Sequence, residues 1–136
     1  MIKKFQYCFQ IEIRLTNKGE CKMDKQFYEG ILTTARSQGN RSAEASALGS
    51  LGNLYAGQRD YSRAIEYHNQ AMQIYESTGD SQGIALSSYN LAGIYEMGLG
   101  DLRTAIKHFE KAVMYVSGAE KDRYSKMLEY LRQKVE

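Results

Sequence analysis

The chain has 136 residues, of which 43% are hydrophobic and 25% are charged, so it is long enough for one domain with a buried core. Its net charge of +2 argues against a nucleic-acid partner, because nucleic-acid-binding proteins usually carry a strongly basic face. No apolar run approaches the roughly 20 residues of a membrane span and no signal peptide is recognisable, so we expect a cytoplasmic protein with no membrane partner.

Residues 1–22 follow a different pattern from the rest of the chain. From Phe5 to Leu15 apolar and polar side chains alternate, which is the period of a β-strand. One interpretation is a strand that pairs with a second copy or covers the following helix. The other is that the segment is not native, because Lys18-Gly19-Glu20 can be encoded by AAGGAG, a ribosome-binding sequence placed suitably before Met23.

Both cysteines, Cys8 and Cys21, lie in this extension. They could form at most one disulfide, and a structural zinc site needs about four ligands. We therefore expect reduced thiols and no metal site.

The remaining sequence contains no proline and is rich in helix-forming residues. Apolar side chains at three- and four-residue steps predict six helices. The expected ranges are Asp24 to Ser37, Arg41 to Ala56, Tyr61 to Ser77, Ser81 to Met97, Leu102 to Ser117, and Lys121 to Val135.

Glycine and Asx residues mark the helix boundaries. Gly39-Asn40 and Gly79-Asp80 each combine a residue suited to end one helix with a residue suited to cap the next. Gly57 and Asp60 are placed to do the same within a helix pair. The unit is therefore a helix, a short turn and a second helix.

An internal repeat relates two such units. Residues Leu51, Gly52, Tyr55, Ala64 and Ala71 recur as Leu91, Ala92, Tyr95, Ala105 and Ala112. The period is 40 residues (79 − 39 for the boundary glycines), but the inner turn of the second unit holds one extra residue, since Asp60 recurs at Asp101 (101 − 60 = 41).

The spacing of these residues resembles the tetratricopeptide repeat, a helix pair with a leucine, small residues and aromatics at fixed offsets. The letters LGN at Leu51 to Asn53 and the long period resemble a subgroup found in Leu-Gly-Asn adaptors and prokaryotic regulators. The resemblance implies an all-α fold, a right-handed α-solenoid of stacked antiparallel helix pairs. Two full repeats are expected at about 41–80 and 81–120 within a domain of residues 23–136, after a half repeat and before a C-terminal capping helix.

The capping helix is expected to be apolar inside and polar outside. Its predicted inner stripe is Tyr124, Met127, Leu128, Leu131 and Val135.

The resemblance also implies a function, because the first helix of each pair lines a concave groove in this family. The matching positions are Ser46, Gly49, Ser50 and Asn53 in one repeat, and Leu86, Tyr89, Asn90, Gly93 and Glu96 in the next. Asn53 and Asn90 are the strongest candidates, since an amide can both donate to and accept from a peptide backbone. The alternative is that these are solvated polar residues on a helix face.

The sequence argues against a carboxylate clamp, a histidine site and a catalytic or phosphate-binding motif. A clamp for a C-terminal carboxylate needs cations, and Gly49, Leu86 and Asn90 stand at the matching positions. His68 and His108 are explained by repetition alone, and no catalytic or phosphate-binding motif is present. We expect no enzyme and no cofactor: a protein-binding scaffold ranks first, then a self-assembling structural element, an RNA binder and an enzyme.

The first predicted helix carries Phe27, Ile31, Leu32 and Ala35 without the partner helix that a complete repeat supplies. An open apolar face of this kind tends to find a partner. A concentration-dependent homodimer, or docking onto a larger protein, is therefore expected.

Overall fold

The computed structural model describes the backbone of residues 18–136 and the side chains of residues 24–136. The strand predicted for Phe5 to Leu15 lies outside the described residues.

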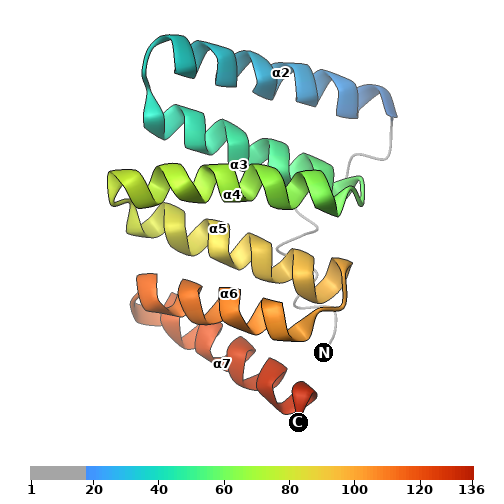
Figure 1. The fold of residues 1–136 in the computed structure, drawn as a ribbon, viewed down its shortest axis with the longest axis vertical. Coiled ribbons are helices and arrows are strands. Elements are labelled where there is room, and N and C mark those ends of the chain that lie inside the picture. Colours follow the sequence, from blue (N-terminus) through green and yellow to red (C-terminus); the bar gives the residue numbers. More distant parts are fainter. Residues whose placement is uncertain (1–17) are drawn as a thin grey trace.

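Within residues 18–136, six α-helices and one π-helical turn form a single row of antiparallel neighbours (Figure 1). The α2 helix lies at one end of the row and α7 at the other, and the connections alternate between the two sides. This confirms the predicted all-α solenoid. The elements are α2 (Lys18–Ser37), α3 (Arg41–Gly57), α4 (Tyr61–Thr78), α5 (Ser81–Gly93), the π-helical turn η2 (Ile94–Gly98), α6 (Leu102–Tyr115) and α7 (Gly118–Val135).

The predicted boundary signals act as expected except at Gly57, which is the last residue of α3, while Arg59 takes the left-handed conformation in that turn. Gly39 and Gly79 follow α2 and α4 with φ of 65° and 70°, a conformation that costs glycine little. Each of the helices α3 to α6 begins with a side chain that accepts a hydrogen bond from the backbone N–H three residues later. These N-caps are Asn40 (3.1 Å), Asp60 (3.2 Å), Asp80 (2.9 Å) and Asp101 (3.1 Å).

Several predicted boundaries need correction. The α2 helix begins at Lys18 rather than Asp24, because helix-compatible residues continue upstream. The α6 helix ends at Tyr115 rather than Ser117, since Val116 is extended with φ −111° and ψ 160°. The α7 helix then begins at Gly118 rather than Lys121.

The extra residue of the second repeat is absorbed by a π-helical turn, where a regular helix to Met97 was predicted. In the first repeat the carbonyl of Tyr55 accepts from the amide of Asp60 at 2.9 Å, and in the second the carbonyl of Tyr95 accepts from the amide of Asp101 at 2.8 Å. The second closure spans one residue more, so η2 widens the helix and leaves the capping aspartate in its repeat position.

Small residues at the repeated positions bring the helices close together. Ala64, Ala71, Ala105 and Ala112 are fully buried. A Cβ added to Gly52 would lie 2.7 Å from the imidazole of His68, so the ring packs directly on the α3 backbone. These positions form the core, as the repeat pattern predicted.

The two histidines are not equivalent, because the step between the second helices is 41 residues. His68 corresponds to Phe109 (109 − 68 = 41), and His108 corresponds to Tyr67 (108 − 67 = 41). Both His68 and Phe109 are buried. The interpretation of the histidines as repeats of each other is therefore wrong.

The C-terminal helix packs its predicted stripe against α6. Tyr124, Met127, Leu128 and Leu131 are buried, but Val135 is 38% exposed because it lies in the last turn of the chain. Val135 is the one predicted stripe residue that does not join the core.

Candidate functional site

The α3 helix contributes a face of small and polar residues to the predicted groove. Ser46, Ser50 and Asn53 follow one another at steps of four and three, and Gly49 lies beside them. Ser46 is exposed and the other three are half-buried. The hydroxyl of Ser50 donates to the carbonyl of Ser46 at 3.1 Å, so this serine is engaged by its own helix.

The α5 helix contributes a stripe with an apolar side chain at each end. Leu86, Asn90, Gly93 and Met97 follow at steps of four, three and four, the last of them in η2. Leu86 is 54% exposed and Met97 is 48% exposed, with a half-buried amide and a glycine between them. Such a surface offers apolar contacts at two places and a hydrogen-bonding group in the middle.

Asn53 and Asn90 stand at different register positions of the two helices. In the 40-residue register Asn53 corresponds to Gly93 and Asn90 to Ser50. The two amides are therefore offset by about one helical turn. Among the side chains that the structure describes, neither amide takes part in a hydrogen bond. Each is half-buried and retains its full capacity to donate and to accept.

The sequence of this repeated scaffold matches the family model described as "Tetratricopeptide repeat" over residues 25–77 and 43–113, more than half of the chain. The chain belongs to the tetratricopeptide repeat family. Repeats of this family generally mediate protein–protein interactions.

Tyr89 occupies a different place in this tetratricopeptide domain from the other predicted groove residues. Its ring stacks on that of Tyr124 in α7, with centroids 4.8 Å apart, and meets Phe109 of α6 edge-on at 5.6 Å. The tyrosine therefore joins three helices, and much of its ring serves packing.

Glu96 is the predicted groove residue with the highest residue number. It lies half-buried in η2, where burial raises the pKa of the carboxyl group and the charge of Lys134 partly opposes that rise. The ammonium group of Lys134 lies over the ring of Tyr130, 4.5 Å from its centroid, and the interaction with Tyr130 raises the pKa of Lys134. The carboxyl group of Glu96 thus interacts with the charge of a lysine supplied by α7.

Tyr130 and Lys134 of α7 are residues that sequence reasoning did not include in the predicted groove. The signal was available, since the register that relates Ser50 to Asn90 continues to Tyr130 (130 − 90 = 40). Treating α7 only as a cap concealed this third first-helix position.

Neither histidine is among the predicted groove residues. His68 is 1% exposed, and burial lowers its pKa to about 4. Among the residues that the structure describes, neither ring nitrogen has a hydrogen-bond partner. His108 is half-buried and stacks on Tyr95 with centroids 5.3 Å apart, and burial lowers its pKa as well. Both rings serve helix packing.

Over the described part of the chain, no three His, Cys, Asp or Glu residues gather as ligands for a metal ion. In the same residues no helix has the length and hydropathy required to cross a bilayer.

Proposed function

We propose that the protein holds a peptide or a segment of a partner protein in the groove lined by α3 and α5, and that it carries out no covalent chemistry. The observation that carries the proposal is the pair of half-buried amides, Asn53 and Asn90, that make no hydrogen bond within the described chain. Neither amide is among the described buried atoms that have no partner, so both remain accessible to solvent and available to donate to and accept from a ligand backbone.

The dimensions of the surface support a backbone ligand. Ser46, Gly49 and Gly93 leave space above the two helices because their side chains are short or absent. A Cβ added to Gly49 would meet no atom within 4 Å, so the space over α3 is open. A ligand backbone can therefore approach the helices closely enough to reach both amides.

The two apolar side chains at the ends of the α5 stripe define the partner further. Leu86 and Met97 are eleven residues apart (97 − 86), which corresponds to about 16 Å along a helix. A segment with an apolar side chain toward each end and a neutral centre fits this spacing. Glu96 and Lys134 then border the site with one charge of each sign, so a strongly charged ligand is disfavoured.

The resemblance of the LGN letters to Leu-Gly-Asn adaptors fits the same proposal, in which the protein works as a cytoplasmic scaffold. A carboxylate clamp does not fit, because Gly49, Leu86 and Asn90 supply no cation where that clamp requires one.

The test is affinity capture from the source cell with three forms of the full chain. The double variant Asn53→Ala/Asn90→Ala should recover the partner with an affinity reduced by about 10-fold, since two neutral hydrogen bonds contribute roughly 0.5 to 1.5 kcal/mol each. The matched control Asn69→Ala/Gln73→Ala removes two amides from the exposed face of α4 and should behave like the wild type.

Circular dichroism should show the same helicity for all three forms, because both asparagines are incompletely buried. Equal recovery of every partner by the wild type and the groove variant would refute the assignment of the groove. Loss of a partner only in the control variant would move the site to α4.

A further inference from the structure

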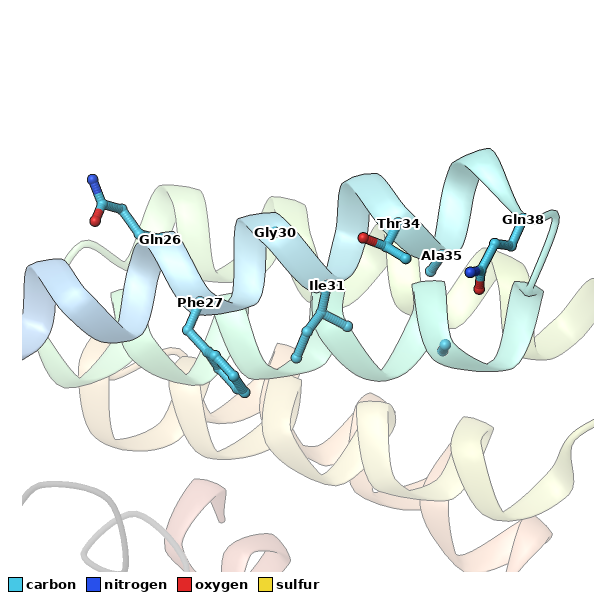
Figure 2. Close-up of a pocket in the computed structure, with 8 residues that line it drawn as sticks. Gln26, Phe27, Gly30, Ile31, Thr34, Ala35 and Gln38 are labelled. Atoms are coloured by element: carbon cyan, nitrogen blue, oxygen red, sulfur yellow. The ribbon is translucent and has the colours of Figure 1, made fainter.

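One face of α2 is open, apolar and free of charge. A depression of about 570 Å³ follows this face and reaches the start of α3, and Figure 2 shows Phe27 and Ile31 pointing to the same side of the helix. Phe27 is 63% exposed, and a Cβ added to Gly30 would meet no atom within 4 Å. None of the lining residues carries a charge: they are Gln26, Phe27, Gly30, Ile31, Thr34, Ala35, Gln38 and Ala43.

The repeat register shows what normally covers Phe27. It corresponds to Tyr67 in α4 (67 − 27 = 40), whose ring stacks on Tyr55 of α3 with centroids 5.4 Å apart and planes 4° apart. In the next pair His108 stacks in the same way on Tyr95, at 5.3 Å and 8°. This position therefore receives an aromatic ring from an antiparallel helix in both complete pairs.

The exposure of Ile31 also indicates that a covering helix is missing from this face. It corresponds to Ala71 (71 − 31 = 40), which is fully buried against the first helix of its pair, whereas Ile31 is 36% exposed. The open face of α2 is thus a helix-binding face whose helix is missing from the described chain.

The sequence of the first residues does not fit the repeat position opposite this face. In the same register Glu12 falls at the position of Gly52 (52 − 12 = 40), where even a Cβ would lie 2.7 Å from the imidazole of His68. The residue that would face Glu12 is Tyr28, which corresponds to His68 (68 − 28 = 40) and is already half-buried. A carboxylate at this contact would be desolvated without a cation.

The opposite end of the molecule does not match the face either. The exposed residues of α7 include charges of both signs, namely Lys121, Asp122, Lys126 and Glu129. Stacking α7 of one copy on α2 of the next would bury these charges against an uncharged surface, which is costly. A head-to-tail chain of copies is therefore disfavoured.

We propose that the face is covered by α2 of a second copy, packed antiparallel about a two-fold axis near Gly30 and Ile31. Each Phe27 then packs into the depression over Gly30 and Thr34 of the other α2, and the absence of a side chain at Gly30 provides room for the ring. Because the patch is uncharged, no like charges meet across the axis. The helix rows of the two copies then join into one longer row. This proposal does not depend on ligand binding by α3 and α5.

Sedimentation equilibrium of the full chain tests the proposal. The apparent mass of the wild type should rise with concentration from 15.5 kDa towards twice that value. Phe27→Glu should weaken the dimer by at least about 10-fold, because it buries an unpaired charge at the centre of the interface. Phe27 is largely exposed in the single chain, so this variant should keep the helicity of the wild type.

Thr33→Glu is the matched control, since it adds the same charge to an exposed residue of α2 outside the depression. It should dimerise like the wild type. A wild type that stays monomeric at all concentrations would overturn the proposal. The face would then be covered by another segment of the chain or by solvent. A dimer that Phe27→Glu leaves unchanged would overturn it as well.

Cross-linking locates the axis. In a background of Cys8→Ser and Cys21→Ser, the variant Ile31→Cys should form an intermolecular disulfide under mild oxidation, and Thr33→Cys should not. Equal cross-linking of the two variants would contradict the α2–α2 contact.

Discussion

The two complete helix pairs solve the same packing problem with different residues. In the α3–α4 pair Gly52 faces His68, and in the α5–α6 pair Ala92 and Phe109 occupy the corresponding positions. Both rings are buried, but only the imidazole can gain a proton and only the imidazole leaves two nitrogen atoms without partners. The first pair is therefore sensitive to pH at a point where the second is not.

The turns of the two pairs differ as well. Arg59 takes a left-handed conformation in the first turn, and Gly100 takes it in the second. The extra residue of the second turn is accommodated in η2 and leaves the following N-cap intact. The helix contacts of a repeat thus tolerate a change of length in the turn as long as the capping residue keeps its place.

The largest expected difference between the two pairs is in how the free energy of unfolding responds to acidification. The pKa of His68 is lowered from 6.5 to about 4 by burial, so the unfolded chain binds a proton more readily than the folded one. This contribution to the free energy of unfolding is complete above pH 6.5 and is lost as the pH falls from 6.5 to about 4, by about 3 kcal/mol.

Urea unfolding between pH 7 and pH 4 checks this for the wild type and for His68→Phe, which installs the residue of the second pair. The difference between the two curves isolates His68, because His108 and the acidic groups contribute to both. Curves that stay parallel over this range would show that the imidazole is not desolvated.

Leucine at the closest helix contacts should have the next largest effect. Ala64 and Ala105 are fully buried at equivalent positions, so either substitution by leucine should overpack its pair by about 2 kcal/mol. Chemical denaturation should give similar losses for Ala64→Leu and Ala105→Leu. Lys107→Leu, on the exposed face of α6, should change stability by less than about 0.5 kcal/mol, and an equal loss there would contradict the assigned register.

The π-helical turn can be probed with two glycines at equivalent positions. A Cβ at Gly98 would lie 2.7 Å from the ring of Tyr61, whereas a Cβ at Gly57 would meet nothing within 4 Å. Gly98→Ala should therefore cost about 1 kcal/mol, and Gly57→Ala should stabilise the protein slightly because alanine restricts the unfolded chain. Thermal melts that shift in the same direction for both variants would rule out the close contact with Tyr61.

The smallest effect is expected at the left-handed turn residue. Arg59 has φ of 62°, which costs about 1 kcal/mol in a residue with a Cβ, and its counterpart Gly100 has φ of 68°. Arg59→Gly should stabilise the fold by about 0.5 kcal/mol, since the greater flexibility of the unfolded glycine offsets part of the gain. Gly100→Arg should destabilise it, and denaturation midpoints that move the other way would show that this turn is not strained.

The repeated fold could be predicted because its signals are local. Helix ends and starts are indicated by Gly39, Gly79 and the capping Asx residues. The small residues at fixed offsets indicate where the helices contact each other. The π-helical turn could not be predicted, because an inserted residue lengthens a helix or a loop equally well in sequence. The side chain of Val135 was misplaced because periodicity does not show that α7, with 18 residues, is longer than the 14-residue α6 beside it.

The predicted groove residues depend on contacts that the sequence does not show. Tyr89 is three residues from the exposed Leu86 and three from the buried Ala92, so helical spacing alone cannot assign its face. Its actual contacts come from Tyr124, more than thirty residues away (124 − 89 = 35), and such pairs are not visible in a single sequence. The role of Asn53 and Asn90 as ligand contacts stays a prediction.

Nuclear magnetic resonance of the side-chain amide groups tests the groove most directly. A labelled protein should be titrated with the captured partner segment, and the NH₂ signals of Asn53 and Asn90 should shift while that of Asn69 on α4 serves as an internal reference. Groove binding predicts saturable shifts of Asn53 and Asn90 with an unchanged Asn69 signal. Saturable shifts of Asn69 with unchanged Asn53 and Asn90 signals would contradict the proposed site.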